Sequence, residues 1–179
     1  MELRGKQLGL VGVGRIGRAV AEKAPAFGMT VAYTARRDAG IPGAVQMPLD
    51  QLLTTSDIVS LHVPMTPDTR HLMDQKALMR MKRGAYLINT SRGPIVNEAA
   101  MLAALHAGKI TAALDVFDKE PLPVDHPLRS APNTVLMPHM GYGTKETWDG
   151  FYPQMIENAL GFMDGKPVRV TNPEAIGKA

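Results

Sequence analysis

The chain has 179 residues, a formal net charge of +3 at pH 7 and no cysteine. This length suits one domain with a sizeable core, since domains cluster near about 100–150 residues. The slight charge and the lack of basic groups interleaved with aromatic residues argue against nucleic-acid binding, and the lack of cysteine excludes disulfides. No apolar run approaches the roughly 20 residues that span a bilayer, and no signal peptide is evident, so we expect a cytoplasmic protein without membrane association.

The first predicted elements surround a glycine-rich turn. An apolar run from Leu8 to Val13 predicts a strand, and a helix-forming pattern follows from Arg18 to Phe27. The spacing Gly-x-Gly-x-x-Gly between them allows a tight turn, close approach of the backbone to a pyrophosphate, and close packing of helix on strand. A plain turn between strand and helix is the alternative interpretation, because short glycine-rich turns are common. The predicted cofactor residues of this turn are Gly12, Gly14, Arg15, Ile16 and Gly17.

Residues 29–33 predict a second strand, which completes a βαβ unit. In an NAD-binding unit, an Asp or Glu about 20 residues past the glycines binds the ribose 2′-hydroxyl. This chain has Thr34, Arg36 and Arg37 at that place, and the nearest acid is Asp38, beyond the arginines. We therefore predict that these three residues bind the cofactor and that NADP is preferred, with NAD as the alternative. A charged loop facing solvent is the other interpretation.

The remaining chain alternates short helices and strands. The patterns predict a loop over 40–48, helices over 49–54, 74–81 and 97–107, and strands over 58–62, 85–89, 111–114 and 133–137. A long helix is expected over 144–163, with Gly150 and Pro153 kinking it or delaying its start, before a polar tail. Near-continuous apolar strands between helices indicate a parallel sheet covered on both faces. The predicted fold is α/β, a Rossmann-type doubly wound sheet in a single domain over 1–179.

Four polar residues follow predicted strands: Arg92, Asp115, Glu120 and His139. Ligands of open parallel sheets bind at the carboxyl ends of the strands, so these residues are expected to share one edge with the glycine-rich turn. Reduction of a 2-oxo acid by a nicotinamide needs a cation for the carboxylate, a proton donor, and a carboxylate that keeps the donor charged. Arg92 suits the first role, His139 the second and Glu120 the third.

Each of these residues also has an ordinary structural interpretation, such as a surface arginine or a glutamate that starts a turn. Asp115 is assigned to the nicotinamide carboxamide. Among the other histidines, His62 is expected to line the cofactor pocket. His71, His106 and His126 lack companion residues of this kind at the predicted sheet edge and are expected to be structural or exposed. No metal-ligand spacing is present, so no metal is predicted.

Five segments together resemble the nucleotide-binding domain of the D-isomer-specific 2-hydroxyacid dehydrogenases. The segments are 12–17 (GVGRIG), 56–64 (SDIVSLHVP), 87–96 (LINTSRGPIV), 113–117 (ALDVF) with Glu120-Pro121, and 138–141 (PHMG). The resemblance implies a catalytic trio of Arg92, Glu120 and His139, a small 2-oxo or 2-hydroxy acid as substrate, and a homodimer. The ending of the second strand is similar to NADP-using glyoxylate and hydroxypyruvate reductases. The further cofactor-binding residues that the resemblance implies are His62, Val63, Pro64, Thr69, Thr90, Ser91, Asp115 and Gly141.

The chain departs from the family at two points. Tyr142-Gly143 follows the predicted catalytic histidine, where many members have small residues. The substrate domain, whose main part precedes the glycine-rich turn in the family, has no counterpart in this sequence, so the helix and tail over 144–179 are expected to expose an apolar face. Two functions are therefore expected: an oxidoreductase that transfers hydride between NAD(P)H and a 2-oxo acid, or a catalytically inactive module that binds or senses the dinucleotide.

Overall fold

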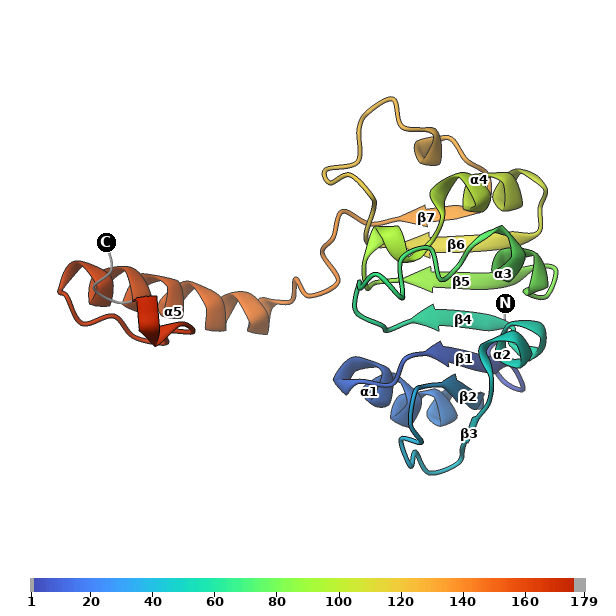
Figure 1. The fold of residues 1–179 in the computed structure, drawn as a ribbon, viewed down its shortest axis with the longest axis horizontal. Helices are drawn as coiled ribbons and strands as arrows, with labels where there is room; N and C mark the ends of the chain where they lie inside the picture. Colours follow the sequence, from blue (N-terminus) through green and yellow to red (C-terminus); the bar gives the residue numbers. More distant parts are fainter. Residues whose placement is uncertain (1, 176–179) are drawn as a thin grey trace. The chain divides into compact units, whose positions relative to one another are not determined.

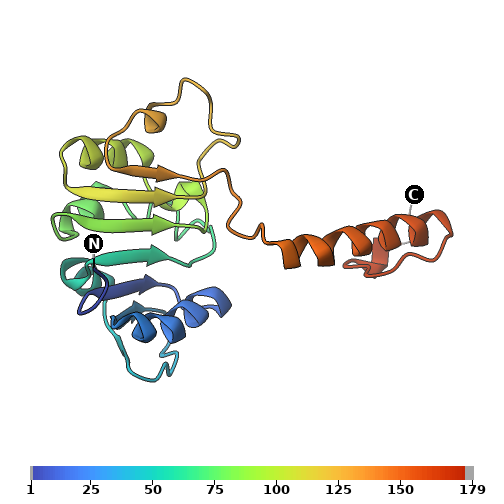
Figure 2. The ribbon, with the colours of Figure 1, turned by 180° about the vertical axis from the view of Figure 1, so that it is seen from behind.

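The computed structural model describes residues 2–175 of the chain. These residues form two compact units, which divide between Gly141 and Tyr142. The first unit holds a seven-stranded sheet in the order β3-β2-β1-β4-β5-β6-β7, with all neighbouring strands parallel. Figures 1 and 2 show this sheet from opposite directions, with the arrowheads of β1, β4, β5, β6 and β7 on the same edge. The strands are β1 (Gln7–Val11), β2 (Thr30–Thr34), β3 (Ala44–Gln46), β4 (Ile58–Leu61), β5 (Ala85–Asn89), β6 (Ile110–Leu114) and β7 (Thr134–Leu136).

Helices and short 3₁₀ turns connect the strands of the first unit, and a long helix lies in the second. The α-helices are α1 (Arg15–Lys23), α2 (Leu49–Thr55), α3 (Gln75–Arg80), α4 (Glu98–His106) and α5 (Lys145–Met163). The 3₁₀ turns are η1 (Ala24–Phe27), η2 (Gly93–Ile95), η3 (Pro127–Arg129) and η4 (Pro173–Ala175).

The order of the strands reverses between β1 and β4. From β1 the chain builds outward through β2 to β3, and it then returns to β4 beside β1 and builds the other way to β7. This arrangement confirms the predicted Rossmann-type doubly wound sheet. In open sheets of this kind, ligands bind outside the carboxyl ends of the strands at the point of reversal.

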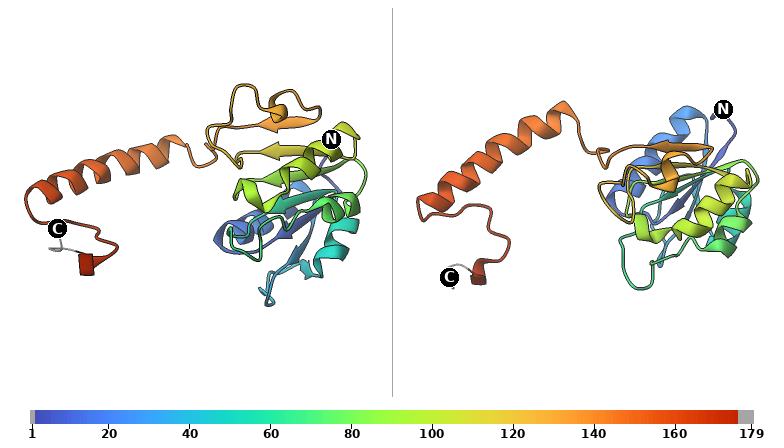
Figure 3. Two further views of the ribbon diagram at one scale, coloured as in Figure 1. Left: turned by 45° about the horizontal axis from the view of Figure 1, so that its top comes forward. Right: turned by 90° about the horizontal axis from the view of Figure 1, so that it is seen from above.

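Two hydrophobic cores lie on opposite faces of the sheet (Figure 3). Helix α1 covers one face over β1 and β2, where Leu10 and Tyr33 are buried. Helices α2, α3 and α4 cover the other face, where Leu87 and Leu105 are buried. All four residues of β4 are buried, as expected for a central strand between two layers.

Polar side chains cap the N-termini of α3 and α4. Asp74 caps α3, since its Oδ1 accepts the backbone N–H of Ala77 at 2.8 Å. Asn97 does the same for α4, accepting the N–H of Ala100 at 2.9 Å. Each cap satisfies a backbone donor that the first helical turn leaves unpaired.

The structure corrects the boundaries of the first helix. Helix α1 begins at Arg15 rather than at Arg18, and it ends at Lys23. The prediction that the helix continues to Phe27 is wrong, because these last residues form the 3₁₀ turn η1. Pro25 lies in that turn, and it lacks the N–H that an α-helix requires.

The predicted loop over 40–48 contains a strand. Residues 44–46 form β3, which pairs in parallel with β2 at the end of the sheet. The strand has three residues, none of them buried, so it shows no alternation from which a strand could be predicted. The loop prediction is therefore wrong for these residues.

The second unit is built on α5. Thr144 caps this helix, since its Oγ1 accepts the N–H of Thr147 at 3.2 Å. The helix begins immediately after the cap and includes Pro153, so the predicted delay of its start is wrong. Within the part of the chain that the structure describes, α5 has no buried residue. Its exposed apolar side chains are Phe151, Tyr152, Met155, Ile156, Leu160, Phe162 and Met163.

Candidate active site

The glycine-rich turn joins β1 to α1 at the carboxyl edge of the sheet. Gly12 has a φ of +89°, and a Cβ there would lie 2.7 Å from a methyl group of Val63. A Cβ at Gly17 would lie 2.5 Å from the carbonyl oxygen of Gly12, so α1 approaches β1 this closely only with glycine. At Gly14, by contrast, no atom of the described residues lies within 4 Å of an added Cβ. The open side at Gly14 leaves room for a phosphate group.

The start of α1 presents backbone donors to this open side. The first helical hydrogen bond runs from the N–H of Arg18 to the carbonyl of Gly14, at 2.9 Å. The N–H groups of residues 15–17 precede it and have no acceptor within the helix. Donors at a helix N-terminus favour anions, so the turn fits the pyrophosphate of a dinucleotide.

The loop after β2 carries the predicted nucleotide-binding arginines. Arg36 and Arg37 are both exposed. Thr34 ends β2, and its carbonyl accepts the N–H of Gly12 at 3.0 Å, so this loop and the glycine-rich turn leave the sheet side by side. The structure thus brings two cations to the same edge as the pyrophosphate cradle.

His62 directly follows β4, next to the glycine-rich turn. Its N–H donates to the carbonyl of Val11 at 2.8 Å, and its Nε2 lies 3.0 Å from Oγ of the buried Ser60. Burial lowers the pKa of His62, so the ring is neutral at physiological pH. A neutral, half-buried imidazole suits the pocket wall predicted for this residue.

The loop that follows is closed by a threonine. Oγ1 of Thr69 donates to the carbonyl of Pro64 at 2.6 Å and accepts the N–H of Thr66 at 2.8 Å. The hydroxyl of Thr69, which is predicted to contact the cofactor, is therefore engaged within its own loop. It shapes the segment that carries Val63 and Pro64.

Three predicted site residues follow β5: the side chain of Ser91 is bonded within the protein, and those of Thr90 and Arg92 are exposed. Ser91 Oγ donates to the carbonyl of Leu61 at 2.7 Å, and its N–H donates to Asn89 Oδ1 at 3.0 Å. Thr90 and Arg92 are exposed. The Nη1 atom of Arg92 donates to the carbonyl of Ser91 at 2.6 Å.

His139 and Glu120 form a close pair, although 19 positions separate them in the sequence. Nδ1 of the histidine lies 2.6 Å from Oε2 of the glutamate, and the side chains are 39% and 34% exposed. Oε1 of Glu120 accepts the backbone N–H of Phe117 at 2.9 Å, which fixes the orientation of the carboxylate. The pairing leaves Nε2 as the nitrogen of His139 that does not face Glu120.

The charges around Glu120 keep it ionised. Burial pushes the pKa of Glu120 up, but the hydrogen bonds from His139 and the Phe117 N–H, together with the positive charges of His139 and Arg92, outweigh burial and lower it. Arg92 follows β5, Glu120 lies in the loop after β6, and His139 follows β7. The three residues predicted as a catalytic trio thus follow three neighbouring strands.

Asp115 lies directly beneath the turn that carries His139. It is 7% exposed, and its Oδ1 and Oδ2 accept the N–H groups of Met140 and Gly141 at 2.9 Å and 2.8 Å. A Cβ at Gly141 would lie 2.9 Å from Oδ2, so glycine allows this close contact. The sequence pattern did not indicate these bonds, which give Asp115 a role in positioning the histidine turn.

His126 has an acidic partner that the sequence pattern did not indicate, in a structural role as expected. Its Nε2 lies 3.1 Å from Oε1 of Glu98, and its Nδ1 accepts the N–H of Leu128 at 3.3 Å. Both ring nitrogens are therefore used to hold the loop between β6 and β7 against the start of α4, a structural role. His106, on α4, is exposed.

Residues 2–175 hold neither a metal-binding cluster nor a helix suited to crossing a membrane. No group of three or more His, Asp or Glu side chains in this range is placed to hold a metal ion. None of the described helices combines the length and the apolar character needed to cross a membrane.

The chain is similar to several known proteins. Glyoxylate reductase of Aeropyrum pernix is 46% identical over 182 residues, which cover 98% of this chain and 54% of that protein. A crystal structure of a protein from Thermus thermophilus is 45% identical with a TM-score of 0.83, covering 94% of this chain and 55% of that one. The structure of an acyclic imino acid reductase in complex with NADPH and D-Arg is 36% identical with a TM-score of 0.79, and the match covers 95% of this chain and 55% of that one. The chain thus spans about half the length of the relatives it matches.

The family is identified by a match over the whole of the first unit, which is most of the chain. Residues 1–141 match the family model described as D-isomer specific 2-hydroxyacid dehydrogenase, NAD binding domain. The match ends at Gly141, where the first compact unit also ends. The chain therefore belongs to the D-isomer specific 2-hydroxyacid dehydrogenases and contains their NAD-binding domain.

Proposed function

We propose that this chain is the nucleotide-binding part of an NAD(P)-dependent enzyme that interconverts a small 2-oxo acid and its D-2-hydroxy acid. The observation that carries the proposal is the pair of His139 and Glu120, 2.6 Å apart at the carboxyl edge of the sheet that also holds the glycine-rich turn. The relative named glyoxylate reductase supports a small 2-oxo acid as the substrate.

The roles of the three residues follow from their chemistry. A bound reduced nicotinamide supplies a hydride to the carbonyl carbon of the 2-oxo acid. Protonated His139 donates a proton from Nε2 to the forming alkoxide, since Nδ1 is held by Glu120. The charge of Glu120 stabilises the imidazolium before the transfer. Arg92 binds the substrate carboxylate with its planar guanidinium.

The proposed cofactor contacts lie along the same edge. The glycine-rich turn, with Arg15 and Ile16, holds the pyrophosphate, and the loop with Thr34, Arg36 and Arg37 holds the adenosine ribose. Loops after β4, β5, β6 and β7 surround the rest of the dinucleotide. Their proposed contact residues are His62, Val63, Pro64, Thr69, Thr90, Ser91, Asp115 and Gly141.

The test of this function follows the absorbance of NADPH during reduction of glyoxylate and of hydroxypyruvate. His139→Gln is expected to lower kcat by at least about 100-fold, because it removes the proton donor. His106→Gln, an exposed histidine on α4, is the matched control and is expected to keep the activity. Equal rates for His139→Gln and the unchanged protein would contradict the proposal.

A second candidate is a module that binds the dinucleotide without catalysis. The glycine-rich turn and the loop with Arg36 and Arg37 favour it, because these nucleotide contacts do not depend on the catalytic trio. Calorimetric titration of the chain with NADPH separates the two candidates when it is combined with the activity assay. Binding without turnover on any 2-oxo acid supports the module, and binding with turnover supports the enzyme.

We also infer that NADP is preferred over NAD. The support is the pair of exposed cations, Arg36 and Arg37, at the place where an NAD-binding unit carries an acid. Parallel titrations with NADPH and NADH test this inference. Tighter binding of NADPH supports it, and tighter binding of NADH overturns the cofactor preference while leaving the fold unaffected.

We propose further that the chain pairs with a second copy through its first unit. Val135 on β7 and Met137 just beyond it are 58% and 52% exposed at the end of the sheet, and apolar side chains grouped in this way favour association. Sedimentation equilibrium measures the mass directly. A monomer mass at every concentration would contradict a homodimer.

A further inference from the structure

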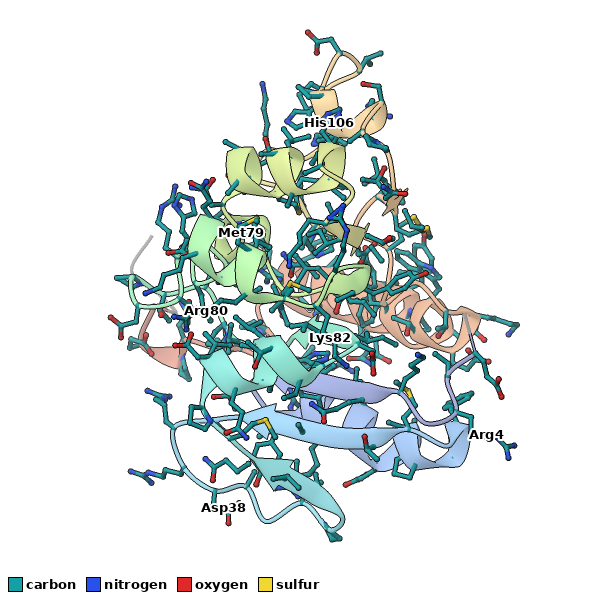
Figure 4. All side chains as sticks on the ribbon, turned by 90° about the vertical axis from the view of Figure 1, so that its right-hand side faces the viewer. Arg4, Asp38, Met79, Arg80, Lys82 and His106 are labelled. Carbon is teal, nitrogen blue, oxygen red and sulfur yellow. The ribbon has the colours of Figure 1, made fainter. Side chains whose placement is uncertain are left out.

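A buried tyrosine holds the acid of the nucleotide-binding loop. Tyr33 on β2 is 2% exposed, and its hydroxyl donates a hydrogen bond to Oδ1 of Asp38. The same hydroxyl accepts the N–H of Ala39 at 3.3 Å, and Asp38 Oδ1 also accepts the N–H of Gly40 at 2.9 Å. Figure 4 labels Asp38 at the end of the sheet formed by β2 and β3. Asp38 is thus tied to the strand that precedes it.

This hydrogen bond reinforces the ordinary charge states of Tyr33 and Asp38. Donation from Tyr33, with a second bond from the Gly40 N–H, lowers the pKa of Asp38. The bond to Asp38, with burial adding to it, raises the pKa of Tyr33. At neutral pH Asp38 is therefore a carboxylate and Tyr33 a phenol that donates to it.

The rest of the loop is held at both ends. Nη2 of Arg18, on α1, donates to the carbonyl of Ala39 at 2.5 Å. Nε2 of Gln46, on β3, donates to the carbonyl of Ala35 at 3.0 Å. Between these contacts, residues 36–37 are exposed. The loop therefore presents two arginines from a backbone that is fixed on either side of them.

We propose that Tyr33 determines nucleotide specificity through its hydrogen bond to Asp38. Because this bond holds the carboxylate of Asp38, the carboxylate does not bind the nucleotide as the acid of an NAD-binding unit does. A carboxylate at the end of the second strand accepts the ribose 2′-hydroxyl of NAD and repels the 2′-phosphate of NADP. With Asp38 held by Tyr33, Arg36 and Arg37 remain as the charges presented to the nucleotide. Tyr33 is in this sense a positioning residue, and the inference rests on the proposed NAD(P) function.

The experiment measures binding to the 179-residue chain with two probes that differ only in the 2′-phosphate, adenosine 2′,5′-bisphosphate and adenosine 5′-monophosphate. The unchanged chain is expected to bind the bisphosphate more tightly. Tyr33→Phe keeps the ring and removes the hydroxyl, so the affinity ratio of bisphosphate to monophosphate is expected to fall about tenfold. Tyr86→Phe, on β5, is the matched control and is expected to keep the ratio.

A second variant distinguishes two possible causes of a lower ratio: the freed carboxylate charge of Asp38, and a loop that is less firmly held. Tyr33→Phe with Asp38→Asn lacks both the hydroxyl and the carboxylate, so the inference expects the ratio to recover toward that of the unchanged chain. Asp38→Asn alone keeps an oxygen that accepts from Tyr33 and from the Gly40 N–H, and it is expected to keep or raise the ratio. Circular dichroism confirms that each variant is folded before its affinities are compared.

The outcomes distinguish this inference from the proposed function. An unchanged ratio in Tyr33→Phe, or a ratio that does not recover in the double variant, overturns the role of Tyr33 and leaves the NADP proposal in place. A chain that prefers the monophosphate overturns both the NADP preference and the role of Tyr33. A chain that binds neither probe, nor NADPH, overturns the nucleotide-binding proposal itself.

Discussion

The carboxylate of Asp115 holds the backbone of Gly141, whose N–H donates to Oδ2 at 2.8 Å, while the N–H of Met140 donates to Oδ1 at 2.9 Å. The preceding residue, His139, has a φ of +56°. A left-handed backbone at a residue other than glycine costs of order 1–3 kcal/mol and persists where surrounding contacts enforce it. The buried carboxylate supplies those contacts and so stabilises the turn that presents His139.

Asp115→Asn tests this relationship. The amide nitrogen of asparagine cannot accept from a backbone N–H, so one of the two bonds is lost, and the free energy of unfolding is expected to fall by about 1.5–3 kcal/mol. Urea denaturation of the chain measures the change. Asp118→Asn, at an exposed position of the same loop, serves as the control. Its free energy of unfolding is expected to stay within about 0.5 kcal/mol of that of the unchanged chain. An Asp115→Asn chain as stable as the unchanged one would remove the role assigned to these bonds.

Glu120 is expected to titrate below its ordinary range. Its lowered pKa depends on His139, so His139→Ala should move the midpoint of Glu120 up toward the ordinary value of about 4.3. Because the folded-state pKa is depressed, the stability that the pair contributes is present above the unfolded-state pKa and is lost as pH falls through the folded value. Carbon-detected NMR of the glutamate carboxyl groups measures the midpoint. His106→Ala should leave it in place, and a midpoint unmoved by His139→Ala would contradict the prediction.

Asp57 connects the start of the sheet to the segment before β5. Its Oδ2 accepts the N–H of Gln7 at 2.9 Å, and its Oδ1 lies 2.9 Å from Nζ of Lys82. Burial raises the pKa of Asp57, but these two bonds and the charges of Lys82 and Lys6 outweigh burial and lower it. Asp57→Asn is therefore expected to cost about 1–2 kcal/mol of unfolding free energy at neutral pH.

The pH dependence of that cost has a fixed sign. The folded-state pKa of Asp57 is depressed, so its stabilisation is present above the unfolded-state value of about 3.9 and disappears as pH falls through the folded value. Urea denaturation at neutral pH and at successively lower pH should show the difference between Asp57→Asn and the unchanged chain shrinking. Asp125→Asn, an exposed control, should show a small difference throughout. A cost that stays constant with pH would mean that the charge of Asp57 is not its cause.

Alanine substitutions at two glycines of the turn should have different effects, one on the stability of the first unit and the other on cofactor binding. An alanine Cβ at Gly17 would lie 2.5 Å from a backbone oxygen, so Gly17→Ala is expected to destabilise the first unit by about 1–3 kcal/mol. Gly14→Ala meets no atom of the described residues within 4 Å, so stability should change little, but NADPH affinity should fall by about tenfold because the methyl group occupies the phosphate side. Urea denaturation and calorimetric titration measure the two effects. Equal losses of stability would contradict this division of roles.

The shared edge of Arg92, Glu120 and His139 was predictable from sequence for a topological reason. Parallel strands place all their carboxyl ends at one edge, so residues that follow separate strands meet there whatever their distance in the chain. The same logic placed the glycine-rich turn at that edge. This prediction required only the alternation of strands and helices along the chain. The sequence pattern indicated every strand except the three-residue β3.

The contacts that orient these residues were not predictable. The bonds from Asp115 to residues 140–141 depend on the backbone of a turn 25 positions away, which no periodic pattern describes. The contact of His126 with Glu98 depends on how a long loop folds over α4. Tyr33 and Asp38 are five positions apart, but the strand predicted over 29–33 does not indicate which group the hydroxyl of Tyr33 binds.

The two edges of the sheet differ in how much change they tolerate. Neighbouring strands lie about 4.8 Å apart, so the spacing of the loops that carry the site is set by the hydrogen-bond ladder and not by the turns at the opposite edge. There, the N–H of Gly84 donates to the carbonyl of Lys109 at 2.8 Å, between elements that carry none of the site residues. New chain ends or an inserted peptide at that edge should leave the distances of the site intact, whereas one extra residue between Leu136 and His139 would move the imidazole of His139 away from Glu120. Engineering of this domain therefore has one permissive edge and one restrictive edge.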